Sequence, residues 1–381
     1  MATTGVVGQH WRAGVTSAGF VEPHDGTAPL GWYVAAADRW HDPRIDTSVR
    51  HQRIAGTAVF ETRMRIPGGD AVQRVWSVAN AGGYTLLSID NDSPSPIAVA
   101  FTRPDLATDR PVADIPIDGI SLPNDAVALP VGHRATVTVA IAHRGSGPTS
   151  LPPGLPGAAA VTRGWQTRID SASRLDLPEA ALVEAVRAAR CEVLLVGPAD
   201  SAAEPERHLL GIGELVRLGD LDDRQVIEIT PSIAAAVAVT ARRGHQLAPA
   251  AFDAAAVALA VAGERRALSD LARVRDSVGR DDRPNVIVEM AEATGDIATV
   301  PAVERRLLAG STLFPTGLPD RWRGVDFEAH RLVAGPASTL SLAVRWHGNN
   351  AAVLWEVAGE PITLSAAVGG SRWASAAPRG E

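Results

Sequence analysis

The sequence predicts a multidomain chain of mixed α and β structure, with β-domains at both ends and a helical middle. Three observations support this. The length of 381 residues suggests two or three domains, at roughly 150 residues per domain. Apolar residues alternate with polar ones before about residue 145 and after about residue 311, but recur with helical spacing in between. Proline and glycine gather where the period first changes.

The first domain is predicted to be an antiparallel β-sandwich over residues 1–145. Short runs of alternating apolar residues recur along it, separated by turn-forming sequences such as Asn91-Asp92-Ser93-Pro94. The expected strands include 60–66, 72–78, 84–89, 97–101 and 135–141. Residues 146–175 follow as a linker, because the segment GSGPTSLPPGLPG is dense in proline and glycine and has no apolar period.

The middle of the chain, residues 176–310, is predicted to be a domain of α-helical hairpins. Five apolar stripes have helical spacing, and glycine follows most of them, which is the usual signal for a helix end. The stripes cover 181–189, 209–216, 226–237, 252–259 and 268–278. Residues 311–381 return to period two, as in Leu340, Leu342, Val344 and Trp346, and form a small C-terminal β-domain.

Charge and composition exclude several function classes. The formal charge is −7, which disfavours nucleic-acid binding. All 36 basic residues are arginine, which excludes reactions that need a lysine amine, such as Schiff-base formation. The single cysteine, Cys191, excludes an internal disulfide and a multi-cysteine metal site. The start has no secretory pattern, and the longest apolar stretches are about half of a membrane span. We therefore expect a cytoplasmic protein with no membrane partner.

No cofactor or metal site is predicted. Gly211, Gly213 and Gly219 lack the spacing of a dinucleotide fingerprint and lie within a helical stripe. His41 and His51, with the nearby aspartates Asp42 and Asp46, resemble a metal or acid–base cluster, but a solvated loop is the preferred interpretation.

A carbohydrate site is predicted near the start of the chain. The sequence holds nine tryptophans against two tyrosines, and a tryptophan face is a good platform for a sugar ring. Trp32 and Trp40 lie among charged residues, so we expect them at the surface, with Asp38 and Asp42 accepting hydrogen bonds from sugar hydroxyls. The alternative is that these rings fill the core, which is the preferred interpretation for the tryptophans of the tail.

Paired carboxylates are what a glycosidase requires, but none can be assigned as catalytic. Each candidate is better explained as a surface charge or as a charge at a helix N-terminus. The candidates are Glu204, Glu206, Asp220, Asp222, Asp223, Glu289 and Glu292.

The order of sandwich, linker, helical hairpins and small β-domain resembles the six-hairpin glycosidases, including bacterial glucoamylase-type hydrolases and disaccharide phosphorylases. The segments NDSPSPIAVAF, LLGIGELVRLGD, AAAVALAVAGERRALSDL and LAVRWHGNNAAVLWE carry the likeness. The layout is also similar to that of actinobacterial proteins. The helical segment, about 135 residues long, supplies only about half of the (α/α)6 barrel that the resemblance implies.

Two functions follow as hypotheses. The first is a non-catalytic, glycosidase-like protein with a carbohydrate-binding or assembly role. The second is a glycan-processing enzyme, a hydrolase or phosphorylase, that uses paired carboxylates and is completed by a second subunit. A carbohydrate ligand and a homo-oligomer are therefore the partners to test.

Overall fold

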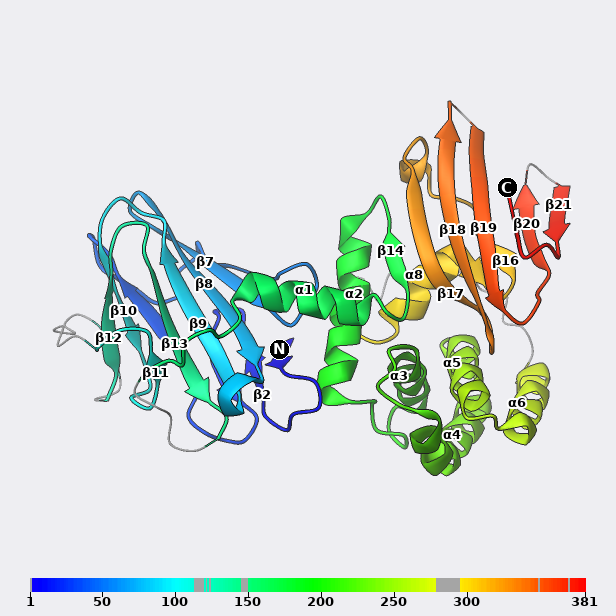
Figure 1. Cartoon of the computed structure of the whole chain (residues 1–381), viewed down its shortest axis with the longest axis horizontal. Helices are drawn as coiled ribbons and strands as arrows, with labels where there is room; N and C mark the ends of the chain where they lie inside the picture. Colours follow the sequence, from blue (N-terminus) through cyan, green and yellow to red (C-terminus); the bar gives the residue numbers. More distant parts are fainter. Residues whose placement is uncertain are drawn as a thin grey trace. The chain divides into compact units, whose positions relative to one another are not determined.

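The computed structural model describes residues 2–112, 120, 122, 125–144, 150–278, 295–348, 350–368 and 371–381. The chain divides into two compact units, Met1–Gln166 (unit 1) and Thr167–Glu381 (unit 2) (Figure 1). The predicted mixture of helices and antiparallel sheets is confirmed. Unit 1 consists mostly of strands, whereas unit 2 combines helices with two sheets.

Unit 1 is built from three antiparallel sheets. They have six strands (β11-β13-β9-β8-β7-β6), four strands (β12-β10-β4-β5) and three strands (β1-β2-β3). The strands are β1 Ala2–Gly5, β2 Arg12–Val15, β3 Val21–Pro23, β4 Trp32–Ala35, β5 Trp40–His41, β6 Arg50–Arg53, β7 Phe60–Ile66, β8 Gly69–Val78, β9 Tyr84–Asn91, β10 Ile97–Phe101, β11 Ala107–Thr108, β12 Val127–Val131 and β13 Thr136–Ala142, with a 3-10 turn, η1, at Asn80–Gly82.

One apolar core joins the two larger sheets of unit 1. Trp32 and Phe101 come from the four-stranded sheet, and Phe60, Met64 and Leu87 come from the six-stranded sheet. All five side chains are at most 1% exposed. This burial explains the alternation in the sequence, because successive side chains of a strand point to opposite faces.

At one end of the six-stranded sheet, His143 is held as a neutral ring. Its Nε2 atom lies 3.0 Å from the hydroxyl of Thr85, and its ring stacks on Trp11 with the ring centres 3.9 Å apart. Burial lowers the pKa of His143 from 6.5 to about 4, although the nearby carboxylate of Asp25 acts in the opposite direction.

Acid is therefore expected to destabilise unit 1 through His143. Between pH 6.5 and pH 4 the unfolded imidazole takes up a proton and the folded one does not, so the free energy of unfolding falls as the pH falls. Because the ring is half-buried, we expect a loss of about 1–3 kcal/mol, complete below pH 4. Amide hydrogen exchange of β9 and β13 measures it, and His143→Gln should remove this part of the pH dependence. Equal slopes in the two proteins would contradict the assignment.

The predicted linker 146–175 is only partly correct. Residues 145–149 lie outside the described residues, but Ala158–Ile169 forms helix α1 and Arg174–Asp176 forms strand β14. The last proline of the segment is Pro156, and the sequence after it is free to form a helix. The carbonyl of Pro156 accepts a hydrogen bond of 2.9 Å from Trp76 Nε1, so this end of the segment is attached to unit 1. The division between the units falls within α1.

Unit 2 contains the remaining helices and two sheets. The sheet orders are β14-β17-β18-β19-β22, which is antiparallel, and β15-β16-β20-β21, in which β16 and β20 are parallel. The helices are α2 Ala180–Val196, α3 Pro205–Arg217, α4 Asp223–Arg243, α5 Ala248–Val261, α6 Arg265–Val278 and α8 Thr299–Leu307, with a 3-10 turn, η2, at Asp320–Trp322. The strands are β15 Leu308–Ala309, β16 Thr312–Leu313, β17 Phe327–Gly335, β18 Ser338–His347, β19 Asn350–Gly359, β20 Leu364–Val368, β21 Ser371–Ser375 and β22 Arg379–Gly380.

The predicted boundary at residue 311 does not separate compact units. Strand β14 precedes the helical region, yet it pairs with β17, which follows it. Buried side chains of α2, α8 and the five-stranded sheet share one core, among them Val186, Leu307 and Leu340. Helices α3 to α6 lie together (Figure 1), and their buried side chains form a second core that includes Phe252. The helical region and the C-terminal strands are therefore one unit.

The helix ends follow the sequence signals. Asp222 and Gln225 form a reciprocal capping box at the start of α4, and Gly244 ends this helix in a left-handed conformation with φ 59°. Pro231 lies inside α4. Gly279, the glycine that follows the last predicted stripe 268–278, lies outside the described residues. Among the described helices, none has the length and apolar character needed to cross a bilayer.

Candidate functional site

Trp32 is not the surface platform that the sequence predicts. Its side chain is 0% exposed, and Nε1 donates a hydrogen bond of 2.9 Å to the carbonyl of Ala18. The charges that suggested exposure follow in the turn after strand β4, whereas the strand lies between β10 and β5 in its sheet. The ring of Trp32 therefore has no free face for a sugar.

Of the other three predicted ligand residues, the two aspartates already have partners within the protein. Trp40 is half-buried on β5. Asp38 Oδ1 lies 3.0 Å from His41 Nε2, and Asp42 forms an ion pair of 2.7 Å with Arg44. Binding of a ligand by Trp40, Asp38 and Asp42 stays a prediction.

The predicted solvated loop around His41 is an ordered polar contact. His41 is only 3% exposed, and its Nδ1 atom lies 3.0 Å from Asp46 Oδ2. Burial raises the pKa of Asp46, but hydrogen bonds from Ser48 and His41 outweigh it and hold this pKa below its usual range. His51 contacts Thr62 instead. In the part of the chain that the structure describes, no three histidine, cysteine or acidic side chains form a metal-binding group.

The loop carboxylates mostly serve helix ends and ion pairs. Asp222 caps α4, Asp220 pairs with Arg168, and Glu204 pairs with Arg207. Glu206 lies buried in the first turn of α3. Glu289 and Glu292 lie outside the described residues.

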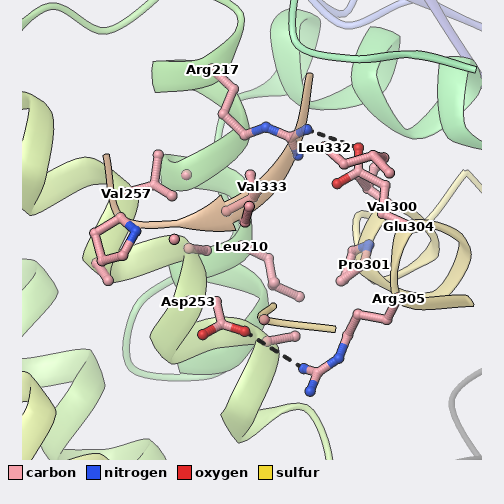
Figure 2. Close-up of a pocket in the computed structure, with 18 of the residues that line it drawn as sticks. Leu210, Arg217, Asp253, Val257, Val300, Pro301, Glu304, Arg305, Leu332 and Val333 are labelled. Carbon is pink, nitrogen blue, oxygen red and sulfur yellow. Dashed lines mark hydrogen bonds and ion pairs between the residues drawn. The ribbon is translucent and has the colours of Figure 1, made fainter. Parts of the chain in front are cut away.

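A pocket in unit 2 is the best candidate site. Its volume is about 290 Å³, and helices α3, α5, α6 and α8 and strand β17 contribute its walls (Figure 2). The middle of the pocket is aliphatic. Its wall includes Leu210, Val257, Val300, Pro301, Leu332 and Val333.

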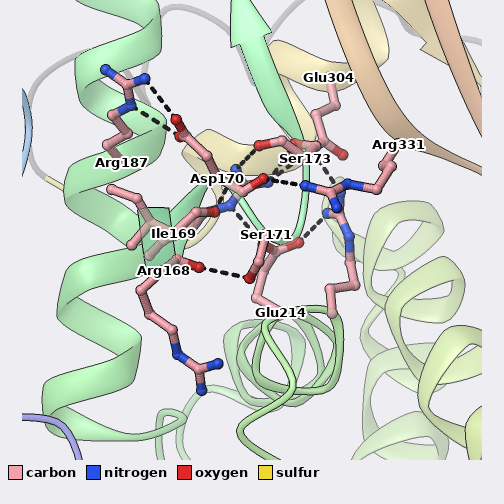
Figure 3. Close-up of polar contacts among 11 residues, drawn as sticks. Arg168, Ile169, Asp170, Ser171, Ser173, Arg187, Glu214, Glu304 and Arg331 are labelled. Atoms are coloured by element: carbon pink, nitrogen blue, oxygen red, sulfur yellow. Dashed lines mark hydrogen bonds and ion pairs between the residues drawn. The ribbon is translucent and has the colours of Figure 1, made fainter. Parts of the chain in front are cut away.

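At one end of the pocket, two arginines and two glutamates form a buried group that we call the Arg190 network. Arg190 is 1% exposed and contacts Glu214 at 3.0 Å and Glu304 at 2.9 Å. Arg217 bonds both glutamates, with a distance of 2.8 Å to Glu304. The hydroxyl of Ser173 donates a hydrogen bond of 2.6 Å to Glu304 (Figure 3).

The charges of the Arg190 network balance within it. Burial raises the pKa of Glu304, but Arg217 and Arg190 outweigh this effect and hold the pKa below its usual value. Glu304 is therefore ionised at neutral pH, and each of the two glutamates contacts two guanidinium groups. Such a group fixes the position of Arg217 and Glu304 in the wall of the pocket.

At the other end of the pocket lies a second polar group, which we call the Asp253 cluster. Asp253 from α5 pairs with Arg275 from α6 at 2.6 Å. It also lies 3.9 Å from Arg305 of α8 (Figure 2). Burial raises the pKa of Asp253 above its usual value, although the two arginines act in the opposite direction. The Asp253 side chain remains 30% exposed, so it is accessible from the pocket.

Sequence reasoning missed every charged residue of this pocket. Glu304 and Arg190 are 114 positions apart, and no local motif joins them. One signal was present: Arg190 lies between Ala189 and Cys191 on an apolar part of α2, where a charged side chain needs a buried partner.

Comparison with known proteins supplies no family. The sequence matches no protein-family model, and no curated protein matches it.

Proposed function

We propose that the protein is a non-catalytic binding protein, and that the unit 2 pocket holds a small carbohydrate. The observation that supports this is the order of polar and apolar walls along the pocket: an aliphatic middle lies between two arginine–carboxylate groups. In this proposal the sandwich and the helical hairpins are a shortened glycosidase-like architecture that binds carbohydrate but does not cleave it. An assembly role and homo-oligomerisation remain predictions beside it.

A sugar ring suits these surfaces because it is itself divided into apolar and polar parts. Its C–H face can pack on Leu210, Val257 and Val333, and hydroxyl groups at its edges can reach the charged groups at the two ends. Hydrogen bonds to ionised groups are stronger than neutral ones, and a few such bonds fix the orientation of a ligand in an otherwise apolar pocket. The volume of about 290 Å³ favours one or two sugar rings over a long chain.

The ion pairs argue against hydrolysis as the first choice. A glycosidase needs one carboxyl group to donate a proton and a second to activate water or attack the sugar. Glu214, Glu304 and Asp253 are the carboxylates of the described pocket wall, and each is paired with two arginines. This arrangement favours holding a ligand over transferring protons to it.

A glycan-processing enzyme remains the second candidate, and one observation favours it. Asp253 has a raised pKa and Glu304 a lowered one, and both line the same pocket. Carboxylates whose pKa values are moved apart are suited to acting as acid and base. In that case Asp253 is the acid and Glu304 is the base.

Isothermal titration of the full chain with glucose, maltose and other neutral saccharides tests the proposal. We expect Asp253→Asn to lower the affinity about tenfold, because it replaces a charge-assisted hydrogen bond with a neutral one. The matched control is Asp270→Asn on α6, since Asp270 is 53% exposed and lies outside the pocket. It should bind as the wild type does.

Product formation is measured in the same samples. Turnover that Asp253→Asn abolishes would replace the binding proposal with the enzyme. If neither neutral nor acidic saccharides give heat with the wild-type chain, both candidate functions are contradicted.

A further inference from the structure

The two ends of the pocket differ in charge. The Arg190 network holds two arginines and two glutamates, so its formal charges cancel. The Asp253 cluster holds two arginines and one aspartate, so one positive charge is left over among the residues that the structure describes there. An uncharged ligand would leave this charge without a counter-ion inside the pocket.

The arginines of the Asp253 cluster have donors to spare. A guanidinium group carries five N–H donors, and a single carboxylate uses only some of them. Arg305 lies 3.9 Å from Asp253, which is too long for a hydrogen bond, and its side chain is 35% exposed. The side chain of Arg275 is 50% exposed.

Arg275 also has open space on a second side. It lines the pocket and a neighbouring cavity of about 460 Å³, bounded by α5, α6 and residues near Pro336. The two guanidinium groups face different oxygen atoms of Asp253, come from two different helices, and are both accessible to solvent. Planar guanidinium groups placed in this way match the oxygen atoms of a carboxylate or a phosphate group.

We propose that the Asp253 cluster is an anion subsite, in which Arg275 and Arg305 bind a carboxylate or phosphate group carried by the ligand. This inference rests on the proposed function and narrows the ligand to an acidic sugar, either a uronate or a sugar phosphate. Asp253 competes with the ligand anion for the same two guanidinium groups. Asp253 therefore lowers the affinity of the subsite for the ligand anion.

Because Asp253 competes with the ligand anion, the affinities for acidic and neutral sugars should change in opposite directions when Asp253 is replaced. We titrate the full chain with D-glucuronate, glucose 6-phosphate and D-glucose at constant ionic strength, and with acetate and inorganic phosphate as anions without a ring. Both acidic sugars are expected to bind about tenfold more tightly than glucose, and the better of the two identifies the anion. Arg305→Gln and Arg275→Gln should each remove this preference.

Asp253→Asn separates the subsite from the proposed function. It should raise the affinity for the acidic sugars about tenfold, because the competing carboxylate is gone, while it lowers the affinity for glucose. The matched control is Arg273→Gln, since Arg273 lies on α6 with Arg275 but is 76% exposed and outside both cavities.

The outcomes are distinguishable. Binding of acetate or phosphate without any sugar preference would support the subsite and overturn the carbohydrate proposal. Equal binding of glucose and the acidic sugars, or an anion preference that survives Arg305→Gln and Arg275→Gln, would overturn the subsite and leave the proposed function standing. Absence of binding by every probe would overturn both.

Discussion

Replacing Arg190 with alanine is expected to lower the free energy of unfolding of unit 2 by about 3–5 kcal/mol. The substitution leaves Glu214 and Glu304 in place, with side chains only 7% and 9% exposed. Arg217 alone then has to balance two carboxylates, and the hydroxyl and carbonyl of Ser173 lose their guanidinium partner. An uncompensated buried charge costs more than the ion pair contributes, so the loss exceeds that of an ordinary surface contact.

Denaturant unfolding of the full chain measures this loss, and hydrogen exchange in α2 and β17 assigns it to unit 2. The matched control is Arg323→Ala, whose partner is Asp320, because both side chains are more than half exposed, at 68% and 92%. We expect the control to change stability by less than about 1 kcal/mol. Equal effects of the two substitutions would show that the Arg190 network does not stabilise the fold.

Replacing Trp32 with alanine is expected to destabilise unit 1 by about 3–5 kcal/mol. Trp32 is among the largest fully buried side chains, and its removal leaves a cavity among Val34, Phe101 and the facing sheet. The carbonyl of Ala18 also loses its hydrogen bond. Trp32→Phe keeps most of the apolar volume and loses only the indole donor, so about 1–2 kcal/mol is expected.

A core residue is identified if stability rises from Trp32→Ala to Trp32→Phe to the wild type. Hydrogen exchange in β4 and β10 measures the stability of unit 1. A stable Trp32→Ala protein with altered saccharide binding would instead return Trp32 to the surface role that the sequence suggested.

The sequence predicts those features of the fold that depend on neighbouring residues. The alternation at 60–66 and the capping signals of α4 are local, and both appear in the structure. The linker prediction was wrong beyond Pro156, because proline and glycine indicate where a loop begins but not where it ends. The predicted surface position of Trp32 was wrong for a similar reason. The charged residues close to it in the sequence lie in the turn between β4 and β5, whereas Trp32 itself lies on strand β4.

The candidate site could not be predicted because its residues meet only through the fold. Asp253, Arg275 and Arg305 come from three helices, and an arginine in an amphipathic helix is most often a solvated residue. Only Arg190, placed on an apolar face, carried a signal of burial in the sequence.

The pairing of β14 with β17 has a consequence for how the chain folds. Arg174 and His330 are partners in this ladder, although 156 positions separate them. A loop of this length must close before the five-stranded sheet is complete, and contacts between distant positions slow folding. Helices α3, α4 and α5 contact their near neighbours in the sequence, so they can associate while the ribosome still holds β17. Strand β14 is thus synthesised long before its partner β17. Until β17 has been synthesised, the apolar face of α2 lacks the strands against which it packs in the folded unit.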